Sequence, residues 1–514
     1  MARNKKRRII IVGAGPGGLT AGMLLAARGF DVHIFEAKST VGGRSARLQV
    51  GDFTFDTGPT FLMMDFVLRE VFEATGRRLE DYLELMPLDP LYTLSFGDRD
   101  FRVTRDRERM RAEIERLFPG NSAGYDRFLR EEGERFKALM PCLTREYSSL
   151  RSYLSPSLLR AVPHLSLGKS VFRNLSRYFD DEKLILSFTF QSKYLGMSAW
   201  ECPALFTMLP YVEHEFGIAH VRGGLHQISS AMARAATESG ATIHLATPVK
   251  QLTFEGDAVT GIELVNGGRE RADAVVLNAD FGHAMTKLVP PEKLRKYRPD
   301  KLAKMDFSCS TFMLYLGVNG RVPMDHHTIV FAKDYKKNVR QIFRDKVLPQ
   351  DDFSFYVQNA SVTDPTLAPA GKSALYVLVP VPNQSSGIDW HREAPEFRRR
   401  LLRLIEERTP LKNLEANIEV ELLTTPQDWQ ERQNVYLGAT FNLSHRWSQM
   451  LHRRPHNEFE EFRNCYLVGG GTHPGSGLPV IYESARIATD LISRRFGALP
   501  LRMSYGAQAP AHSS

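Results

Sequence analysis

The fold of this chain is decided by Arg8-Ile9-Ile10-Ile11-Val12-Gly13-Ala14-Gly15-Pro16-Gly17-Gly18-Leu19, a short apolar run that enters a glycine-rich loop. The four apolar residues Ile9 to Val12 are typical of a strand buried on both faces of a parallel sheet. The residues that follow predict a helix over 19–28, rich in Ala and Leu, and a second strand over 31–36. The stretch therefore indicates a strand–loop–helix–strand unit, the opening of an α/β fold.

The loop has the spacing Gly13-x-Gly15-x-x-Gly18, and each glycine has a physical reason. Gly13 permits a tight turn, Gly15 lets the backbone approach a pyrophosphate, and Gly18 allows close packing of helix on strand. The helix N-terminus then offers free N–H groups to phosphates. Glu36, at the end of the second strand, is placed to accept hydrogen bonds from a ribose, and its charge disfavours NADP. We expect a dinucleotide at this loop.

A second glycine pair and a second glycine loop favour FAD over NAD. The pair lies in Val41-Gly42-Gly43-Arg44-Ser45, where Arg44 is placed to neutralise phosphate charge, and the turn Asp56-Thr57-Gly58-Pro59 is predicted to lie against a flavin. Near the other end of the chain, the loop Gly469 to Pro479 also joins a short apolar strand to a helix. FAD uses one such loop for its pyrophosphate and the other for its isoalloxazine end, whereas one nicotinamide nucleotide rarely needs both.

Composition places the chain of 514 residues among ordinary globular proteins. Hydrophobic residues make up 43% and charged residues 25%, which excludes wholesale disorder and a small disulfide scaffold. The four cysteines stand far apart without a CxxC pair, so we expect no metal site and favour a reducing cytoplasm. No apolar run reaches the length of about 18 residues that a membrane-spanning helix needs.

One basic stretch points to a membrane surface. The net charge is +8, and residues 147–179 contain no acidic residue, while Arg151, Arg160 and Lys169 alternate there with apolar side chains. Such a segment suits docking on an anionic membrane surface, with apolar groups in the lipid and cations at the head groups, and the basic N-terminus, with Arg3 and Lys5, would help. Nucleic acid is not expected as a partner, because no recognition motif accompanies the charge. We expect a cytoplasmic protein that associates peripherally with the membrane.

These motifs and several longer segments resemble the bacterial-type phytoene desaturases, FAD-dependent carotenoid desaturases within the amine-oxidase-like flavoproteins. The resemblance extends over nearly the whole chain. The segments that carry it most specifically are Arg222-Gly223-Gly224, Val362 to Pro369, Tyr376 to Pro382 and Tyr466 to Gly475.

The resemblance implies an α/β fold: a discontinuous, Rossmann-like FAD-binding domain with a parallel sheet and helices, and an α+β substrate domain with a second, mixed sheet and a helical membrane-facing part. It implies FAD-binding parts at 1–75, 216–290 and 456–498, a helical substrate and membrane region at 76–215 and a substrate domain at 291–455. The tail at 499–514 is rich in Pro, Gly, Ala and Ser, and we expect it to be disordered. The residues expected to contact FAD are Gly13, Ala14, Gly15, Pro16, Gly17, Gly18, Glu36, Ala37, Gly43, Arg44, Gly58, Pro59, Val249, Gly470, Gly471, Gly477, Leu478, Pro479 and Val480.

The implied reaction introduces C=C bonds into a long isoprenoid polyene by hydride transfer to FAD, with oxygen or a quinone as electron acceptor. No acid–base constellation stands out, which suits chemistry supplied by a cofactor. His473 is a weak catalytic candidate, since a histidine in such a loop more often positions the backbone. A hydrocarbon needs an apolar tunnel, and residues that ordinary core packing also explains are candidates for its wall: Phe188, Phe190, Tyr194, Met197, Trp200, Phe206, Met208 and Tyr211.

Three alternatives remain open from the sequence. The first is a C30 diapophytoene desaturase or diapocarotenoid oxidase, which would differ in the length of its tunnel. The second is a related FAD-dependent carotenoid isomerase, retinol saturase or amine oxidase. The third is a non-catalytic protein that binds FAD or lipid.

Overall fold

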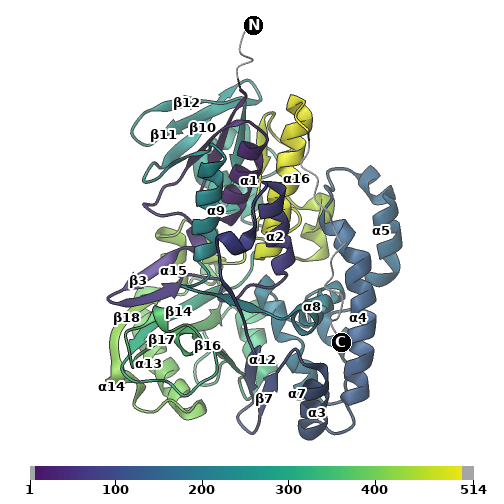
Figure 1. Cartoon of the computed structure of the whole chain (residues 1–514), viewed down its shortest axis with the longest axis vertical. Coiled ribbons are helices and arrows are strands. Elements are labelled where there is room, and N and C mark those ends of the chain that lie inside the picture. Colours follow the sequence, from purple (N-terminus) through teal and green to yellow (C-terminus); the bar gives the residue numbers. More distant parts are fainter. Residues whose placement is uncertain (1–5, 500–514) are drawn as a thin grey trace.

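The computed structural model describes residues 6–499 and contains two large sheets (Figure 1). The first is a five-stranded, all-parallel sheet in the order β19-β13-β1-β2-β9. Its strands are β1 (Arg8–Val12), β2 (Asp31–Phe35), β9 (Thr242–His244), β13 (Ala274–Leu277) and β19 (Cys465–Leu467). Three separate segments of the chain thus build one sheet, and the predicted parallel sheet is confirmed.

The unbroken apolar run of β1 is explained by burial on both of its faces. Ile9 and Ile11 join the core under α1 (Pro16–Ala27), α9 (Gln227–Glu238) and α16 (Leu478–Phe496). Ile10 and Val12 join a different core, shared with the three-stranded sheet of β10 (Val249–Glu255), β11 (Ala258–Leu264) and β12 (Arg269–Arg271). Because side chains alternate along a strand, a strand covered on both faces must be apolar at every position.

The second sheet has seven strands in the order β18-β14-β17-β16-β15-β6-β7 and is antiparallel except between β15 and β6. Helix α13 (Trp390–Arg408) covers one face, and the hairpin of β3 (Arg47–Val50) and β4 (Phe53–Asp56) contributes Phe53 and Phe55 to the core on the other. Its strands are β6 (Tyr92–Ser95), β7 (Asp100–Val103), β14 (Ser310–Val318), β15 (His327–Val330), β16 (Phe355–Asn359), β17 (Ser373–Val381) and β18 (Ile418–Thr424). The predicted second, mixed sheet is confirmed.

The segment predicted to be helical over 76–215 needs a correction at its start. Strands β6 and β7 belong to the second sheet, and β5 (Leu85–Pro87) pairs with β8 (Ala219–Val221). These strands are three or four residues long and lie among charged residues, so they carry no recognisable periodicity. The partner of β6 is β15 and that of β5 is β8, both far away in the sequence, which explains why the local pattern missed these two strands.

The other helices lie mostly on the side of the molecule that carries α4 and α5 (Figure 1). Within residues 6–499 no helix combines the length and the apolar character needed to cross a bilayer. Apart from Leu499, the tail predicted over 499–514 lies outside the described residues. The remaining helices are α2 (Asp65–Ala74), α3 (Arg107–Leu117), α4 (Ser122–Leu143), α5 (Pro156–Ala161), α6 (Val171–Leu175), α7 (Glu182–Ser187), α8 (Met208–Phe216), α10 (Phe281–His283), α11 (Pro299–Leu302), α12 (Tyr335–Arg340), α14 (Leu414–Asn417) and α15 (Pro426–Glu431).

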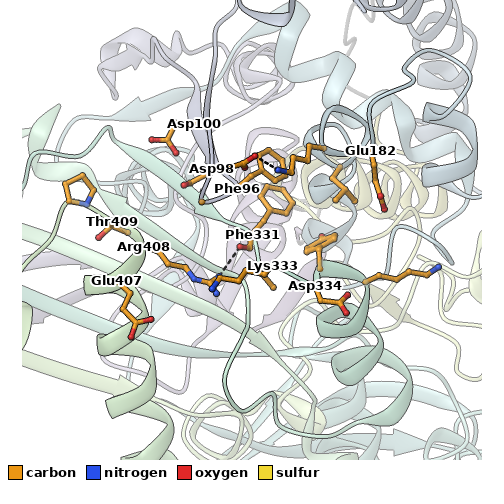
Figure 2. A pocket seen from close by; sticks show the side chains of 18 of the residues that line it. Phe96, Asp98, Asp100, Glu182, Phe331, Lys333, Asp334, Glu407, Arg408 and Thr409 are labelled. Atoms are coloured by element: carbon orange, nitrogen blue, oxygen red, sulfur yellow. Dashed lines mark hydrogen bonds and ion pairs between the residues drawn. The ribbon is translucent and has the colours of Figure 1, made fainter. Parts of the chain in front are cut away.

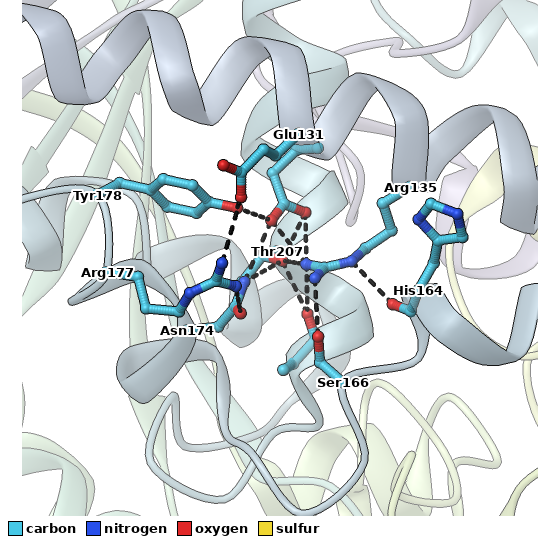
Figure 3. A network of polar contacts seen from close by, with 10 residues as sticks. Glu131, Arg135, His164, Ser166, Asn174, Arg177, Tyr178 and Thr207 are labelled. Carbon is cyan, nitrogen blue, oxygen red and sulfur yellow. Dashed lines mark hydrogen bonds and ion pairs between the residues drawn. The ribbon is translucent and has the colours of Figure 1, made fainter.

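A buried polar network fixes the segment after α5 to helix α4 (Figure 3). Arg135 forms an ion pair with the fully buried Glu132, at 2.6 Å, and donates to the carbonyl oxygen of His164 at 2.9 Å and to Ser166 Oγ at 2.8 Å. Glu132 also accepts hydrogen bonds from Thr207 Oγ1 and Asn174. A buried ion pair is tolerated only when its remaining polar atoms have partners, and here they hold the loop after α5 in place.

Candidate cofactor and active site

Three neighbouring strands of the first sheet end at the same edge. Strand β1 leads into Gly13, β13 into Asn278 and β19 into the loop that begins at Val468. From β1 the chain builds β2 and β9 on one side and β13 and β19 on the other, so the strand order reverses between β1 and β13. In open α/β sheets, ligands bind outside the carboxyl ends of the strands at such a reversal.

The first glycine loop has the geometry that its spacing predicts. Gly13 has a φ of +99°, and a Cβ on Gly18 would lie 2.1 Å from the carbonyl oxygen of Gly13, so only glycine lets α1 start this close to β1. Helix α1 begins after Gly15 with Pro16 in its first turn, without a capping side chain and without an acidic residue in that turn. Its end is therefore an open site for an anion.

The two glycine loops, from opposite ends of the chain, touch each other. A Cβ on Gly17 would lie 3.3 Å from the backbone nitrogen of Gly469 and 3.1 Å from Ile481 Cγ2. Asn278 stands at this junction, where its Nδ2 donates to the carbonyl oxygen of Gly13 at 3.1 Å. A Cβ on Gly15 would lie 2.9 Å from the same Nδ2. The sequence analysis missed Asn278 as a site residue, and its place directly after a buried strand was the available signal.

The C-terminal loop ends at a second uncapped helix. Gly477 is the N-cap of α16, with no capping side chain and no acidic residue in the first turn. A Cβ on Gly477 would meet nothing within 4 Å, and Leu478 and Val480 are only half-buried, so this helix end faces open space. Gly470 and Gly471 are buried behind it, and a Cβ on Gly471 would lie 2.5 Å from Phe281 Cβ.

Arg454, which the sequence analysis did not single out, braces this loop from inside. The side chain is fully buried and donates to the carbonyl oxygens of Gly470 at 2.7 Å and Thr472 at 3.0 Å. It also donates to the carbonyl oxygens of Leu443 and Ser444. Burial lowers the pKa of Arg454 to about 9. The energetic cost of burying this guanidinium is offset by hydrogen bonds to backbone carbonyl oxygens.

Glu36 closes the other end of the first loop. It is buried, and its Oε2 accepts the N–H of Ala14 at 2.7 Å while its Oε1 accepts the N–H of Lys38 at 2.9 Å. The N–H of Thr247 donates to the carbonyl oxygen of Glu36, which brings the start of β10, and with it Val249, alongside Glu36 and the exposed Ala37. The structure thus places these three predicted residues together.

The second glycine pair lies on the first loop. The N–H of Gly42 donates to the carbonyl oxygen of Ala14, and a Cβ on Gly43 would lie 3.7 Å from Gly15 Cα. Arg44 donates through Nη1 to the carbonyl oxygen of Thr440 at 2.8 Å and lies 3.7 Å from Asp280. Part of its charge is therefore compensated within the chain.

The turn at 56–60 joins the two sheets. A Cβ on Gly58 would lie 2.5 Å from the carbonyl oxygen of Arg44, so the turn, with Pro59, abuts the second glycine pair. Three tyrosine hydroxyls of the second sheet hold it: Tyr315 donates to the carbonyl oxygen of Thr57 at 2.8 Å, Tyr376 to that of Gly58 at 2.9 Å, and Tyr356 to Thr60 Oγ1 at 2.9 Å. The sequence analysis did not predict this use of the tyrosines.

Two buried carboxylates connect the segments that carry the resemblance. Asp364, in the segment Val362 to Pro369, accepts the N–H of Gly223 at 2.6 Å and lies 3.2 Å from His220 Nε2. Asp56 accepts the N–H groups of Leu225 and His226, each at 2.8 Å. The Arg-Gly-Gly segment at 222–224 is thus held between the 56–60 turn and the second sheet.

His473 anchors the C-terminal loop to the helical region. Its Nε2 lies 2.7 Å from the carbonyl oxygen of Arg145, and its ring contacts that of Tyr147. Burial lowers the pKa of His473 to about 4, so the ring is neutral near pH 7 and Nε2 is the donor. This contact favours a positioning role, and the catalytic role of His473 stays a prediction.

The candidates for a tunnel wall divide into two groups. Phe188, Phe190, Met197, Met208 and Tyr211 are buried in the main core, whereas Tyr194, Trp200 and Phe206 are only half-buried. Trp200 also lines a cleft of about 1040 Å³ between the β6–β7 hairpin, α7 and α12, with the stacked rings of Phe96 and Phe331 in its wall (Figure 2). This cleft lies apart from the glycine loops, since none of their residues lines it.

Comparisons with known proteins agree with this architecture. The model of the flavin containing amine oxidoreductase family matches residues 16–493. A 4,4'-diapophytoene desaturase (4,4'-diapolycopene-forming) from Methylomonas sp is 58% identical over 489 residues, which cover 95% of this chain and 96% of that protein. A zeta-carotene-forming phytoene desaturase from Myxococcus xanthus is 42% identical, with 95% and 94% covered.

Solved structures show the same fold at low sequence identity. An oxidoreductase from Methanosarcina mazei superposes with a TM-score of 0.64 at 16% identity, covering 94% of this chain and all 100% of the other. Putrescine oxidase bound to putrescine gives a TM-score of 0.60 at 16% identity, with 95% and 99% covered. With the family match, these findings make FAD the cofactor and confirm the predicted fold class. The chain belongs to the flavin containing amine oxidoreductases and, within them, to the FAD-dependent carotenoid desaturases.

Proposed function

We propose that the chain holds FAD where its two glycine loops meet and uses it to desaturate a linear C30 isoprenoid hydrocarbon of the diapophytoene type. One observation carries the site: a Cβ on Gly17 would lie 3.3 Å from Gly469 N and 3.1 Å from Ile481 Cγ2, so the two loops lie side by side, with two uncapped helix N-termini at one edge of the parallel sheet. Both ends present N–H groups without a competing acidic side chain, which suits a ligand with a pyrophosphate at one end and an electron-accepting ring at the other.

The residues at the junction fit FAD by their chemistry. Gly13 to Gly18, with Ala14, Pro16 and the end of α1, would hold the pyrophosphate, and Gly43 and Arg44 would lie beside it. Each carboxylate oxygen of Glu36 already accepts one hydrogen bond and keeps a lone pair for a ribose hydroxyl. Ala37 and Val249 flank that position for the adenine. The isoalloxazine end would lie among Gly58, Pro59, Gly470, Gly471, Gly477, Leu478, Pro479 and Val480.

The bound cofactor supplies a hydride acceptor, and the chain supplies rigidity and charge. The N-terminus of α16 stabilises negative charge next to it by about 0.3–2 kcal/mol. The hydroxyls of Tyr315, Tyr356 and Tyr376 hold the 56–60 turn against the second sheet.

We propose that the chain is divided into FAD-binding and substrate-binding parts as the sequence analysis expects. Residues 1–75, 216–290 and 456–498, the expected FAD-binding parts, contain all five strands of the first sheet.

The C30 substrate is favoured over a C40 one by relatedness. The Methylomonas diapophytoene desaturase is 58% identical to this chain, and the Myxococcus phytoene desaturase, of similar coverage, is 42% identical. Phytoene, the C40 hydrocarbon, is the second candidate. Hydrocarbons of this kind carry no polar or charged group, so recognition has to come from apolar wall residues such as the half-buried Tyr194 and Phe206.

The substrate's solubility places it in lipid, and one surface of the chain suits contact with a membrane. Four large apolar side chains between residues 154 and 167 are exposed, with exposed fractions from 48% to 73%: Leu154, Leu159, Val162 and Leu167. Arg151, Arg160 and Lys169 are exposed in the same stretch. We call these residues the 151–169 patch. Helix α5 carries part of it at the edge of the molecule (Figure 1).

The patch combines an apolar surface with cations, as a peripheral membrane anchor does. The buried ion pair of Glu132 and Arg135 holds the backbone that carries the patch in place, because Arg135 binds His164 and Ser166, which lie between patch residues in the sequence. The basic N-terminus contributes less than the sequence suggests, since Arg7 and Arg8 form ion pairs with Asp273 and Glu270. Arg3 and Lys5 lie outside the described residues. Electron acceptors compatible with this location are oxygen and a membrane quinone.

Replacing Gly15 by Val should abolish retention of FAD, because the new side chain would fill the space between the loop and Asn278, where even a Cβ would lie at 2.9 Å. Flavin per folded chain, measured by absorbance after purification, should fall from about one to near zero. The matched control is Ala27→Val, the same kind of enlargement at an exposed position of α1. Folded Gly15→Val protein that keeps one FAD per chain would contradict the assignment.

Expression in two hosts, one that accumulates diapophytoene and one that accumulates phytoene, tests the substrate. Extracts of the C30 host should gain visible absorption bands, and their positions report how many double bonds are added. The C40 host should gain weaker bands or none. Conversion in the C40 host alone would make phytoene the substrate. No conversion in either host, with FAD-loaded protein present, would contradict a desaturase.

Membrane docking is tested by sedimentation with vesicles that contain an anionic phospholipid. The variant Leu154→Ser, Leu159→Ser, Leu167→Ser should lose most of its bound fraction, and Arg151→Glu, Arg160→Glu, Lys169→Glu should lose binding in a salt-sensitive manner. The matched control replaces three exposed apolar residues outside the patch, Val265→Ser, Val347→Ser, Val362→Ser, and should sediment like the unmodified chain. Equal binding of all four proteins would show that the 151–169 patch is not the membrane-binding surface.

A further inference from the structure

Desaturation releases two hydrogens, and the residues described so far account for only one of them. Bound FAD would accept one of them as a hydride, and the other has to leave the neighbouring carbon as a proton. Two histidines in the interior are poor acceptors, because burial lowers the pKa of His327 and of His214 to about 3. His473 binds the carbonyl oxygen of Arg145 and is neutral near pH 7. A base for the second hydrogen has to be sought elsewhere in the interior.

Glu213, on helix α8, is a buried carboxylate that the site has not yet used. Its exposed fraction is 0%, and within residues 6–499 no Lys, Arg or His forms an ion pair with it. Its Oε2 accepts hydrogen bonds from Tyr92 Oη at 2.9 Å and from Gln191 Nε2 at 2.8 Å. Its Oε1 has no partner in the described part of the chain. A carboxylate with no structural counter-charge is expensive to bury, and such groups concentrate at functional sites.

The surroundings of Glu213 leave it close to titration at neutral pH. Burial raises the pKa of Glu213 to about 7, and the hydrogen bonds from Gln191 and Tyr92, with the nearby Tyr194 hydroxyl, offset only part of this rise. The groups around it are uncharged phenols: Tyr92 from β6 and Tyr194 from the segment 190–195. Beside Glu213 on α8, His214 is bound at Nδ1 by Tyr125 of α4 at 3.1 Å. An acid–base group near the working pH accepts and releases a proton with least cost.

Tyr194 connects this carboxylate to the proposed flavin end of the site. Its hydroxyl lies near enough to Glu213 to help lower the pKa of that carboxyl, and its side chain is only half-buried, unlike those of Tyr92 and Gln191. Its ring contacts that of Phe61 with centroids 5.6 Å apart, in an edge-to-face arrangement. Phe61 directly follows the turn at 56–60, where Gly58 and Pro59 are proposed to face the flavin. Tyr194 therefore stands between the Glu213 carboxylate and the place where a hydrocarbon would meet FAD.

We propose that Tyr194 and Glu213 take up the proton released in each desaturation, a role that rests on the proposed function. The hydride leaves one carbon with its electron pair for FAD, and the C–H electron pair of the adjacent carbon becomes the new bond. The proton of that C–H bond passes to Tyr194 Oη while the phenolic proton moves to the Glu213 carboxylate. Glu213 later releases it to water, which restores both groups. Tyr194 faces the substrate, and Glu213 is the positioning residue that acts through it.

The test compares Glu213→Gln and Tyr194→Phe in the FAD-loaded chain with Glu215→Gln, a neutralisation two residues along the same helix. In the unmodified chain, turnover should rise with pH through about 7, because the base must be ionised. Glu213→Gln should lower turnover by about 10²-fold or more and remove this rise, with flavin content unchanged. Tyr194→Phe should lower turnover similarly, and Glu213→Asp should restore part of the rise. Glu215→Gln should leave both unchanged.

A second readout needs no turnover. Because the folded state raises the pKa of Glu213, it binds a proton that the unfolded state has lost, so stability falls as pH rises from about 4.5 to 7 and is level above. Glu213→Gln should flatten this part of the profile, whereas Tyr194→Phe should keep it. Glu213→Gln protein with unchanged turnover and pH profile would overturn the inference alone. If that variant does not fold, full turnover of Tyr194→Phe would overturn it. Absence of any turnover in the unmodified chain would instead overturn the proposed function along with it.

Discussion

The close approach of the chain at Gly17 to Gly469 and Ile481, which leaves no room for a side chain at residue 17, is the constraint on which the rest of the structure depends. It is possible only because β1, β13 and β19 are parallel neighbours that end at one edge, and because glycine at 13, 15, 17 and 18 leaves no side chain in the way. Asn278 bonds to the first loop and Arg454 to the second. Both helix ends are uncapped, and their free N–H groups would gain partners from a phosphate at one end and an electron-accepting ring at the other.

The second sheet depends on this junction through the 56–60 turn. Tyrosines 315, 356 and 376 reach across from three strands to hold the turn, and Asp56 and Asp364 tie it to the Arg-Gly-Gly segment. Segments that look unrelated in the sequence thus meet around one interior. The 151–169 patch lies on the helical side of the molecule, and His473 links that side back to the C-terminal loop. The contact of His473 with Arg145 thus joins the side of the molecule proposed to meet the membrane to the loop proposed to hold the flavin.

Features with a local pattern could be predicted from the sequence, and features made by distant contacts could not. The apolar run of β1, the glycine spacing and the helices after both loops identified the fold class and the cofactor, because each has its own periodicity or turn requirement. Arg454 and the three tyrosines carry no such pattern, since their roles exist only after strands far apart become neighbours, and Asn278 is marked only by its place after a buried strand. Strand β6 was missed for the same reason, because it pairs with the distant β15, and β7 joins the sheet only through its hairpin with β6. In the sequence, Glu213 is one of several acidic residues in predicted helices. Only its complete burial, which the sequence does not show, identifies it as a candidate functional residue.

The most direct measurement of the central claim is the spectrum of the bound flavin during anaerobic mixing with substrate. FAD-loaded protein would be combined with anionic vesicles that carry the C30 hydrocarbon, and the oxidised-flavin band would be followed together with the polyene bands. The account predicts that the flavin band disappears as polyene absorption grows, with one new double bond for each flavin reduced. A flavin that stays oxidised in vesicle-bound protein, in the presence of either the C30 or the C40 hydrocarbon, would contradict the claim that the glycine-loop junction delivers these substrates to FAD.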